Sequence, residues 1–278
     1  MYRILILGGD GFIGKNLCLS LSKLNFKIFA VVKKKIKKNY YLKKINYLEC
    51  NISKEKELKK IFINNFDIII NCSGNINHSN KNETQMSHFK VIKNLKKIIK
   101  NKKVRLFIQM GSSLEYGFSN SPHKETLRCR PKSHYGKAKY SATKELLSMD
   151  SVNFLVLRLY QVYGPYQKIN RLIPQTINFC LKNKKFKYSE GKQIRNFLFI
   201  GDLVNLIKII VKKKKIISGI YNVGSNENFS IRYVINKIQK IIRKGYPDYG
   251  SLKMRKDEME KFYPSNKKIK KAFNWKPR

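Results

Sequence analysis

The sequence predicts an α/β protein with a doubly wound parallel sheet and a smaller lobe formed by its C-terminal part. Apolar strands alternate with amphipathic or basic helices over the first part of the chain. The first strand runs directly into a glycine-rich turn, and the regular alternation is lost beyond Tyr163-Gly164-Pro165. A parallel sheet covered by helices on both faces accounts for the first part. Shorter elements punctuated by Gly and Pro form the second.

The expected strands are short apolar runs, and the expected helices carry apolar residues at helical spacing. The strands lie at residues 3–7, 27–32, 45–49, 67–71, 105–110 and 153–159. The helices lie at residues 15–24, 55–62, 83–100 and 134–149. This order of elements predicts two domains, one at residues 1–163 and a lobe at residues 164–278.

The turn after the first strand predicts a dinucleotide-binding site. Its glycines fit Gly8-x-x-Gly11-x-x-Gly14 as well as Gly9-x-Gly11-x-x-Gly14, between a strand and a helix. Glycines at such a turn let the backbone approach a pyrophosphate that lies on the helix N-terminus. We therefore expect a Rossmann-type domain whose cofactor contacts Gly8, Gly11, Gly14 and the helix start at Phe12 and Ile13.

Tyr135 and Lys139 are four residues apart on the last of these helices, so their side chains share a face. A tyrosine normally titrates near pH 10, and it serves as an acid or base at neutral pH only when a nearby cation stabilises the phenolate. Lys139 is placed to do that. The expected strand at 105–110 runs into Gly111-Ser112-Ser113, at the edge of the sheet where ligands bind in open α/β folds. Ser112 can donate a hydrogen bond there to a substrate oxygen.

Composition narrows the classes of partner. The chain has 278 residues and a formal net charge of +43, which attracts polyanions. Its lysines are spread over nearly every expected element, and no RNA- or DNA-binding motif accompanies them, so we expect no specific nucleic acid. The cysteines form no Cys-x-x-Cys pair, and the His and Cys residues have no metal-ligand spacing, so we expect no metal. Without a signal peptide or a long apolar run, we expect a cytoplasmic protein with no membrane insertion.

These motifs, in this order, resemble the extended short-chain dehydrogenases/reductases, the NAD(P)-dependent nucleotide-sugar epimerase/dehydratase group. The residues that match the family are the turn at 8–14, Ser112 before Tyr116-Gly117, and the pair Tyr135 and Lys139. Two later segments match as well, at Arg158-Leu-Tyr-Gln-Val-Tyr-Gly-Pro165 and Arg195-Asn-Phe-Leu-Phe-Ile-Gly-Asp202.

The resemblance implies a nucleoside-diphosphate sugar as substrate and Ser112, Tyr135 and Lys139 as catalytic residues. It also implies substrate contacts from four residues, namely Ser113, Gln161, Arg195 and Arg255. Arg195 and Arg255 would hold the diphosphate, because a guanidinium can bind two phosphate oxygens at once. Asn51 stands where the family usually has an adenine-contacting Asp, and Ile52 follows it. Surface-glycan precursor synthesis is the family-level expectation.

The cofactor choice separates the reaction types. The strand at 27–32 runs into Lys33-Lys34-Lys35, where an NAD enzyme usually carries an acidic residue for the ribose hydroxyl. We therefore favour NADP(H), with NAD as the alternative. NADPH favours a reductase acting on a keto group of the sugar, with C4 as the first candidate. A 4-epimerase with bound NAD is the alternative.

Two further functions, a 4,6-dehydratase and a non-catalytic sensor, fit the sequence less well than a reductase or an epimerase. A 4,6-dehydratase usually carries an acidic pair directly after the catalytic Ser/Thr, whereas this chain has Ser113 and Leu114 there, with Glu115 one position too late. A non-catalytic NADP(H)-binding sensor would have no chemical reason to keep a complete Ser112, Tyr135 and Lys139 set.

The resemblance also bears on assembly and on the C-terminus. Family members often dimerise through two helices of each subunit, and the matching helices here are at residues 83–100 and 134–149. The chain stops at a segment, residues 273–278, that resembles the one just before the family's last helix. The lobe is therefore expected to be truncated or to manage without that helix.

Overall fold

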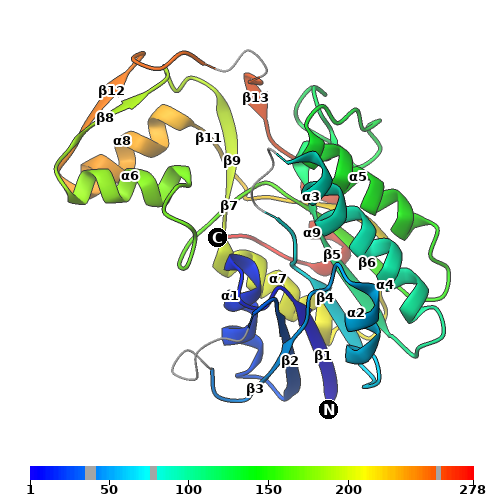
Figure 1. Ribbon diagram of the computed structural model, residues 1–278. Coiled ribbons are helices and arrows are strands. Elements are labelled where there is room, and N and C mark those ends of the chain that lie inside the picture. Colours follow the sequence, from blue (N-terminus) through cyan, green and yellow to red (C-terminus); the bar gives the residue numbers. More distant parts are fainter. Residues whose placement is uncertain (35–41, 76–79, 255–257) are drawn as a thin grey trace.

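The computed structural model describes residues 1–34, 42–75, 80–254 and 258–278. A large parallel sheet forms its centre, in the strand order β10-β6-β5-β4-β1-β2-β3 (Figure 1). The strands are β1 Tyr2–Leu7, β2 Phe26–Val32, β3 Ile45–Glu49, β4 Ile68–Asn71, β5 Leu106–Ser112, β6 Phe154–Leu159 and β10 Gly219–Val223. Every neighbouring pair is parallel, which confirms the predicted doubly wound sheet.

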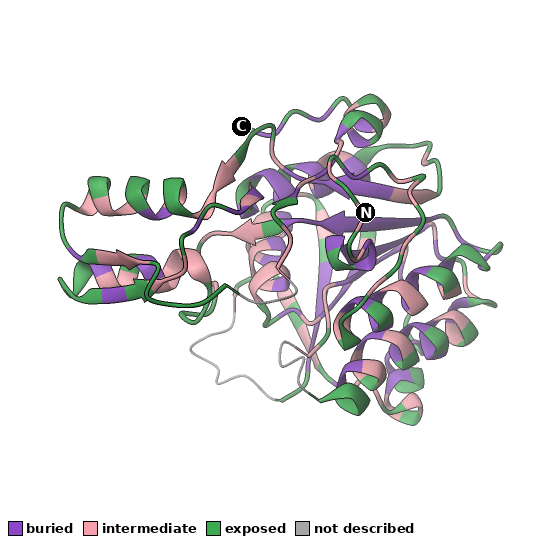
Figure 2. Ribbon diagram, turned by 90° about the horizontal axis from the view of Figure 1, so that it is seen from above, coloured by how far each residue is buried: buried purple, intermediate pink, exposed green. Residues whose placement is uncertain are grey.

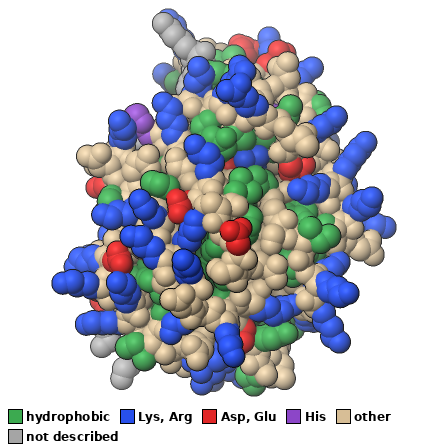
Figure 3. Space-filling view, turned by 90° about the vertical axis from the view of Figure 1, so that its right-hand side faces the viewer, with side chains coloured by type: hydrophobic (Ala, Val, Ile, Leu, Met, Phe, Trp, Pro, Cys, Tyr) green, Lys and Arg blue, Asp and Glu red, His purple; other side chains and the backbone are tan. Residues whose placement is uncertain are grey.

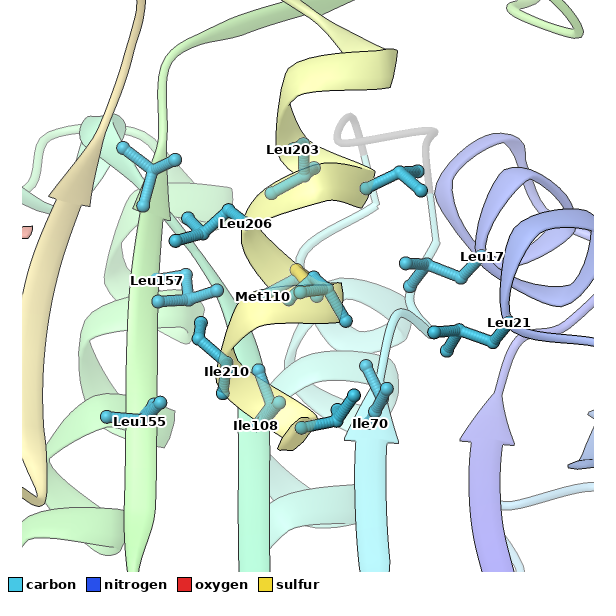
Figure 4. Close-up of a cluster of buried hydrophobic side chains, with 14 of the residues drawn as sticks. Leu17, Leu21, Ile70, Ile108, Met110, Leu155, Leu157, Leu203, Leu206 and Ile210 are labelled. Carbon is cyan, nitrogen blue, oxygen red and sulfur yellow. The ribbon is translucent and has the colours of Figure 1, made fainter. Parts of the chain in front are cut away.

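Helices cover both faces of this sheet, because alternate strand residues point to opposite sides. On one face, Ile4 and Ile6 pack with α1 Phe12–Leu21, α7 Ile200–Lys212 and α9 Lys267–Phe273. On the other face, Leu5 and Leu7 pack with α2 Glu55–Ile61, α4 Val91–Ile99 and α5 His134–Leu147. Figure 4 shows the first of these cores, where α7 lies over the central strands.

The helix predicted at 83–100 is continuous but not uniform. It begins as α3 Lys81–Gln85, passes through a π-helical turn η2 Met86–Lys90, and continues as α4. Asn80 caps its start by accepting a hydrogen bond from the Glu83 backbone N–H at 3.1 Å. The π-helical turn changes the helical phase, and apolar spacing alone did not reveal it.

The second lobe projects from one end of the sheet (Figure 1). It contains α6 Leu172–Leu181, β8 Lys185–Tyr188, α8 Ile231–Ile242 and β12 Tyr246–Tyr249, around a small core of Cys180, Phe186 and Ile235. A mixed sheet of β7 Gln161–Tyr163, β9 Ile194–Phe199, β11 Asn228–Ser230 and β13 Lys261–Phe262 joins it to the large domain. Figure 2 shows buried central strands and largely exposed helices in the lobe.

The chain does not stay in the lobe after residue 164. Strand β10 pairs with β6 at the edge of the large sheet, and α7 and α9 belong to its core. Trp275 is fully buried, and its Nε1 donates to the Asp202 carbonyl at 3.2 Å. The domain boundary between residues 163 and 164 therefore remains a prediction. The large domain includes β10, α7 and α9, which follow that boundary in the chain.

Candidate active site

Strand β5 and helix α5 bring the three predicted catalytic residues to one edge of the sheet. Ser112 is the last residue of β5, and Tyr135 and Lys139 lie in the first turns of α5. Lys139 is 5% exposed, and its Nζ donates to the Met110 carbonyl of β5 at 2.7 Å. The same Nζ lies 5.7 Å from the centre of the Tyr135 ring. The buried ammonium therefore ties α5 to β5 and places its charge beside the phenol.

Gly136 allows α5 to approach the turn that follows Ser112. A Cβ at Gly136 would lie 2.5 Å from the carbonyl oxygen of Leu114, so only a glycine fits at this distance. The helix start is fixed by Ser133, whose Oγ accepts from the Gly136 backbone N–H at 3.0 Å. Together these contacts hold Tyr135, the neighbour of Gly136, close to the turn after Ser112.

Ser112 itself is held by two hydrogen bonds. Its backbone N–H donates to Glu115 Oε1 at 2.9 Å, and its Oγ accepts from the Leu114 backbone N–H at 3.2 Å. The second bond uses a lone pair of Oγ and not its proton. The Ser112 hydroxyl can therefore still donate a hydrogen bond to a carbonyl or alkoxide oxygen.

Glu115 is a residue whose role the sequence did not reveal. Its side chain is fully buried, and its Oε2 accepts from Arg158 Nε at 2.9 Å and from Thr143 Oγ1 at 2.8 Å. Its two oxygens thus join the Ser112 backbone to α5 and β6. A signal was present, because Arg158 is the one charged residue in the apolar run of β6 and requires a buried partner.

The cofactor turn has the close contacts that its glycines predict. Gly8 has a φ of +74°, and a Cβ at Gly14 would lie 2.1 Å from the Gly8 carbonyl oxygen. Gly11 is exposed and precedes α1, and a Cβ there would meet only the Gly8 oxygen, at 3.3 Å. Phe12 and Ile13 open the helix, where backbone N–H groups have no intrahelical acceptor. This arrangement fits a pyrophosphate beside Gly11.

The strand order reverses between β1 and β4, and dinucleotides bind at the carboxyl ends of the strands beside such a point in doubly wound sheets. Lys33 follows β2 and is exposed. Asn51 and Ile52 follow β3 and are half-buried. Asn51 Oδ1 accepts from the Ser53 backbone N–H at 3.2 Å. The structure therefore places these predicted cofactor residues at the same edge of the sheet as Gly8.

The predicted substrate residues are not all brought together. Ser113 is buried in the turn after Ser112, and Gln161 is exposed at the start of β7. Arg195 is 5% exposed and forms an ion pair with Glu258. Its guanidinium also donates to the carbonyls of Ile194 and Met259, both at 2.7 Å. In this arrangement Arg195 is engaged within the lobe, and Arg255 lies outside the described residues.

Two features are absent from the part of the chain that the structure describes. Among these residues, no three or more His, Cys, Asp or Glu side chains gather in a way that could hold a metal ion. No helix within the same residues has the length and apolar character needed to cross a membrane.

A known protein family matches most of the large domain. Residues 4–224 match the model of the NAD dependent epimerase/dehydratase family. The chain is 28% identical to CDP-abequose synthase of Salmonella typhimurium, over 99% of this chain and 93% of that protein. It is 29% identical to dTDP-D-glucose 4,6-dehydratase of Dictyostelium discoideum, over 86% of this chain but only 62% of that protein. The chain thus spans less than two thirds of the second relative.

Solved structures share the fold at low sequence identity. UDP-glucuronic acid 4-epimerase of Bacillus cereus, in complex with UDP-glucuronic acid and NAD, superposes with a TM-score of 0.89 at 23% identity. The match covers 99% of this chain and 94% of that one. UDP-glucose 4-epimerase of Thermotoga maritima, with UDP-glucose, gives the same TM-score at 20% identity, with the same coverage.

Proposed function

This chain belongs to the NAD dependent epimerase/dehydratase family and is an enzyme of that family, and from this premise we propose that it is a nucleotide-sugar reductase. It would act on a keto group of a nucleoside-diphosphate sugar, with C4 as the first candidate. The observation that carries the proposal is the attachment of α5 to β5, which brings Ser112, Tyr135 and Lys139 to the carboxyl end of β5.

Each of the three side chains has a role that its position supports. A bound nicotinamide would supply the hydride. Tyr135 would give its proton to the sugar oxygen as that oxygen gains negative charge. Ser112 would donate a hydrogen bond to the same oxygen and so stabilise the developing charge. Lys139, buried beside the phenol, would stabilise the phenolate left after proton transfer.

A dehydratase is disfavoured by the residues after Ser112. Ser113 and Leu114 carry no carboxylate, and the Glu115 carboxylate is fully buried between Arg158 and Thr143. A carboxylate in these bonds cannot move a proton on a sugar without breaking the pair. The 4-epimerase is the second candidate, because the Bacillus cereus and Thermotoga maritima structures with this fold are 4-epimerases.

The cofactor remains to be decided between NADP(H) and NAD. Lys33 supports NADP(H), because an exposed ammonium after β2 attracts a 2′-phosphate and no carboxylate repels one. The comparisons do not support that preference, since the related structures described above include one with NAD. Arg195 stays a proposed diphosphate ligand, and this role requires its guanidinium to leave Glu258 when substrate binds.

The homodimer is also a proposal, through helices α3 to α4 and helix α5. These helices lie side by side, with Lys96 Nζ 3.3 Å from Glu145 Oε1. Figure 3 looks onto this side of the molecule and shows Lys and Arg side chains around hydrophobic ones. Like charges would oppose pairing at low salt, so we expect the dimer fraction in sedimentation to rise with ionic strength.

The test of the function is cofactor oxidation against a panel of nucleoside-diphosphate 4-keto-6-deoxy sugars. NADPH and NADH are compared, with Tyr135→Phe as the control. Turnover that consumes cofactor and falls by about 10²- to 10⁴-fold in Tyr135→Phe supports the reductase. Interconversion of nucleotide-sugars without net cofactor consumption would instead establish the epimerase.

A further inference from the structure

His88 lies against the ring of Tyr135. It is 4% exposed and belongs to the π-helical turn η2. The centres of the two rings are 5.0 Å apart, and their planes are inclined at 84°. This is an edge-to-face contact, which aromatic rings prefer over face-to-face stacking.

Gly74 and Asn75, which follow β4, contact the other side of the His88 ring. A Cβ at Gly74 would lie 1.9 Å from His88 Cε1, so the imidazole rests directly on the Gly74 backbone. Gly74 has a φ of +148°, which favours glycine at this position. His88 Nε2 lies 3.2 Å from the Asn75 carbonyl oxygen. The imidazole therefore fills the space between the Gly74 backbone and the Tyr135 ring.

His88 belongs to the buried face of its helix, and α3, η2 and α4 all pack against α5, which carries Tyr135. Thr84 and His88 are buried, and so are Val91, Ile92 and Leu95 further along. These residues are three or four positions apart, which is the spacing of one helix face, so the polar pair and the apolar residues lie on the same side of the helix. Single π-helical turns inside α-helices occur often at functional sites.

We propose that His88 is a positioning residue that packs between the Gly74 backbone and the Tyr135 ring and so prevents that ring from swinging away from its position. The inference rests on the proposed function in taking Tyr135 as the proton donor. Rotation about the Tyr135 Cα–Cβ bond swings the ring between staggered positions and carries its hydroxyl oxygen with it, so backbone placement alone does not set the position of that oxygen. A displacement of about 1 Å in a reacting group can cost on the order of 10²-fold in rate. A Tyr135 ring that cannot swing about its Cα–Cβ bond would keep its hydroxyl at a fixed distance from the substrate oxygen.

The first test separates the ring contact from the fold. His88→Leu replaces the imidazole by an apolar side chain of similar size, which removes both the ring and the contact to the Asn75 carbonyl, and we expect kcat to fall about 10-fold or more, with KM nearly unchanged. His88→Phe restores a ring edge and should recover kcat to within about 3-fold of the wild type. Wild-type kcat in His88→Leu, or equal loss in the Leu and Phe variants, would overturn the proposal.

Phe89→Leu is the matched control. Phe89 is the next residue of the same π-helical turn, but it lines a shallow pocket with Ser141, Lys144 and Glu145 further along α5. Removing that ring should leave kcat unchanged. An equal loss in Phe89→Leu would show that any aromatic deletion in the turn disturbs the site, and it would count against a specific role of His88.

A second test needs no substrate and so stands apart from the reductase proposal. The protein is labelled with ¹³C in its tyrosine rings, and the Tyr135 signal is assigned by its loss in Tyr135→Phe. We expect this signal to shift in His88→Leu and to stay in place in Phe89→Leu. A Tyr135 signal unchanged in His88→Leu would refute the contact even if the substrate panel shows no turnover.

Discussion

Glu115 and Arg158 form a buried ion pair behind Ser112. Glu115 Oε2 lies 2.9 Å from Arg158 Nε, and the two side chains are 0% and 2% exposed. The Arg158 guanidinium also lies 4.5 Å from the centre of the Tyr116 ring, and the Tyr116 hydroxyl donates to Asn222 at 2.8 Å. The pair therefore connects the turn that follows Ser112 to β6 and, through Tyr116, to β10.

The pair predicts different effects on stability and on activity. Glu115→Leu or Arg158→Met alone leaves a buried charge without its partner and should lower the free energy of unfolding by about 3–5 kcal/mol. The double variant should lose less than the sum of the two single losses, because neither charge remains. Its kcat should nevertheless stay low, because the Ser112 N–H has lost Glu115 Oε1 as acceptor.

Urea unfolding of the four proteins and their kcat values check this prediction. Thr143→Val serves as a control, because it removes one hydrogen bond to Glu115 and leaves the ion pair intact. Additive losses in the double variant would show that the two charges are not coupled.

Gly11 is expected to matter for the cofactor and little for the fold. Its φ of −73° suits any residue, and a Cβ would meet only the Gly8 oxygen at 3.3 Å. Gly11→Ala should therefore change the free energy of unfolding by less than about 1 kcal/mol. The added methyl group would lie where we propose that the cofactor pyrophosphate binds, so we expect the cofactor dissociation constant to rise about 10-fold or more.

Gly14→Ala is the comparison, because its Cβ would lie 2.1 Å from the Gly8 carbonyl oxygen. This variant should lose both stability and cofactor binding. Fluorescence titration with NADH and NADPH, alongside thermal unfolding, measures both quantities. Cofactor binding by Gly11→Ala with wild-type affinity would place the pyrophosphate elsewhere.

Much of the large domain was predictable because its signals are local. Strands such as residues 45–49 and helices such as residues 134–149 follow from apolar runs and spacing, and the structure confirms them within a few residues. The pairing of β10 with β6 was not predicted, because a distant return to the sheet edge leaves no local pattern. The family resemblance is confirmed by the match over residues 4–224.

The site was predictable in its motifs and not in its supporting contacts. Ser112, Tyr135 and Lys139 could be named from the end of the strand at 105–110, from the four-residue spacing of Tyr135 and Lys139, and from the family resemblance. The roles of Glu115 and His88 depend on which buried side chains meet across elements, and no spacing rule shows that. Arg195 was predicted from a motif, but its pairing with Glu258 depends on the path of the chain in the lobe.

Lys33 decides the cofactor preference if the 2′-phosphate argument is right. Lys33→Ala should raise the KM for NADPH about 3- to 10-fold and leave the KM for NADH unchanged, because only NADPH carries the phosphate. Lys34→Ala, the adjacent exposed lysine, is the control for general charge. Initial rates at varied cofactor concentration give the values. Equal effects on both cofactors would remove the reason to favour NADP(H).

His123 predicts a loss of stability under mildly acidic conditions. Its ring is fully buried, with Nδ1 2.8 Å from the Tyr160 hydroxyl and Nε2 2.9 Å from the Ser119 carbonyl oxygen. Burial lowers the pKa of His123, and the hydrogen bond to Ser119 opposes this only in part. As pH falls below about 6.5, the unfolded chain binds a proton at this residue before the folded chain does.

The direction in which pH changes the free energy of unfolding follows from that order of protonation. The unfolded state binds more protons in this window, so the free energy of unfolding falls as pH decreases, by up to about 1.4 kcal/mol per pH unit from this residue. His123→Phe keeps a ring beside Tyr116 and Phe262, whose ring centres both lie 4.7 Å from that of His123. It should be less stable at pH 7.5 but show a smaller loss between pH 7 and pH 5.5. Urea unfolding at these pH values gives both slopes, and equal slopes would show that His123 does not titrate on unfolding.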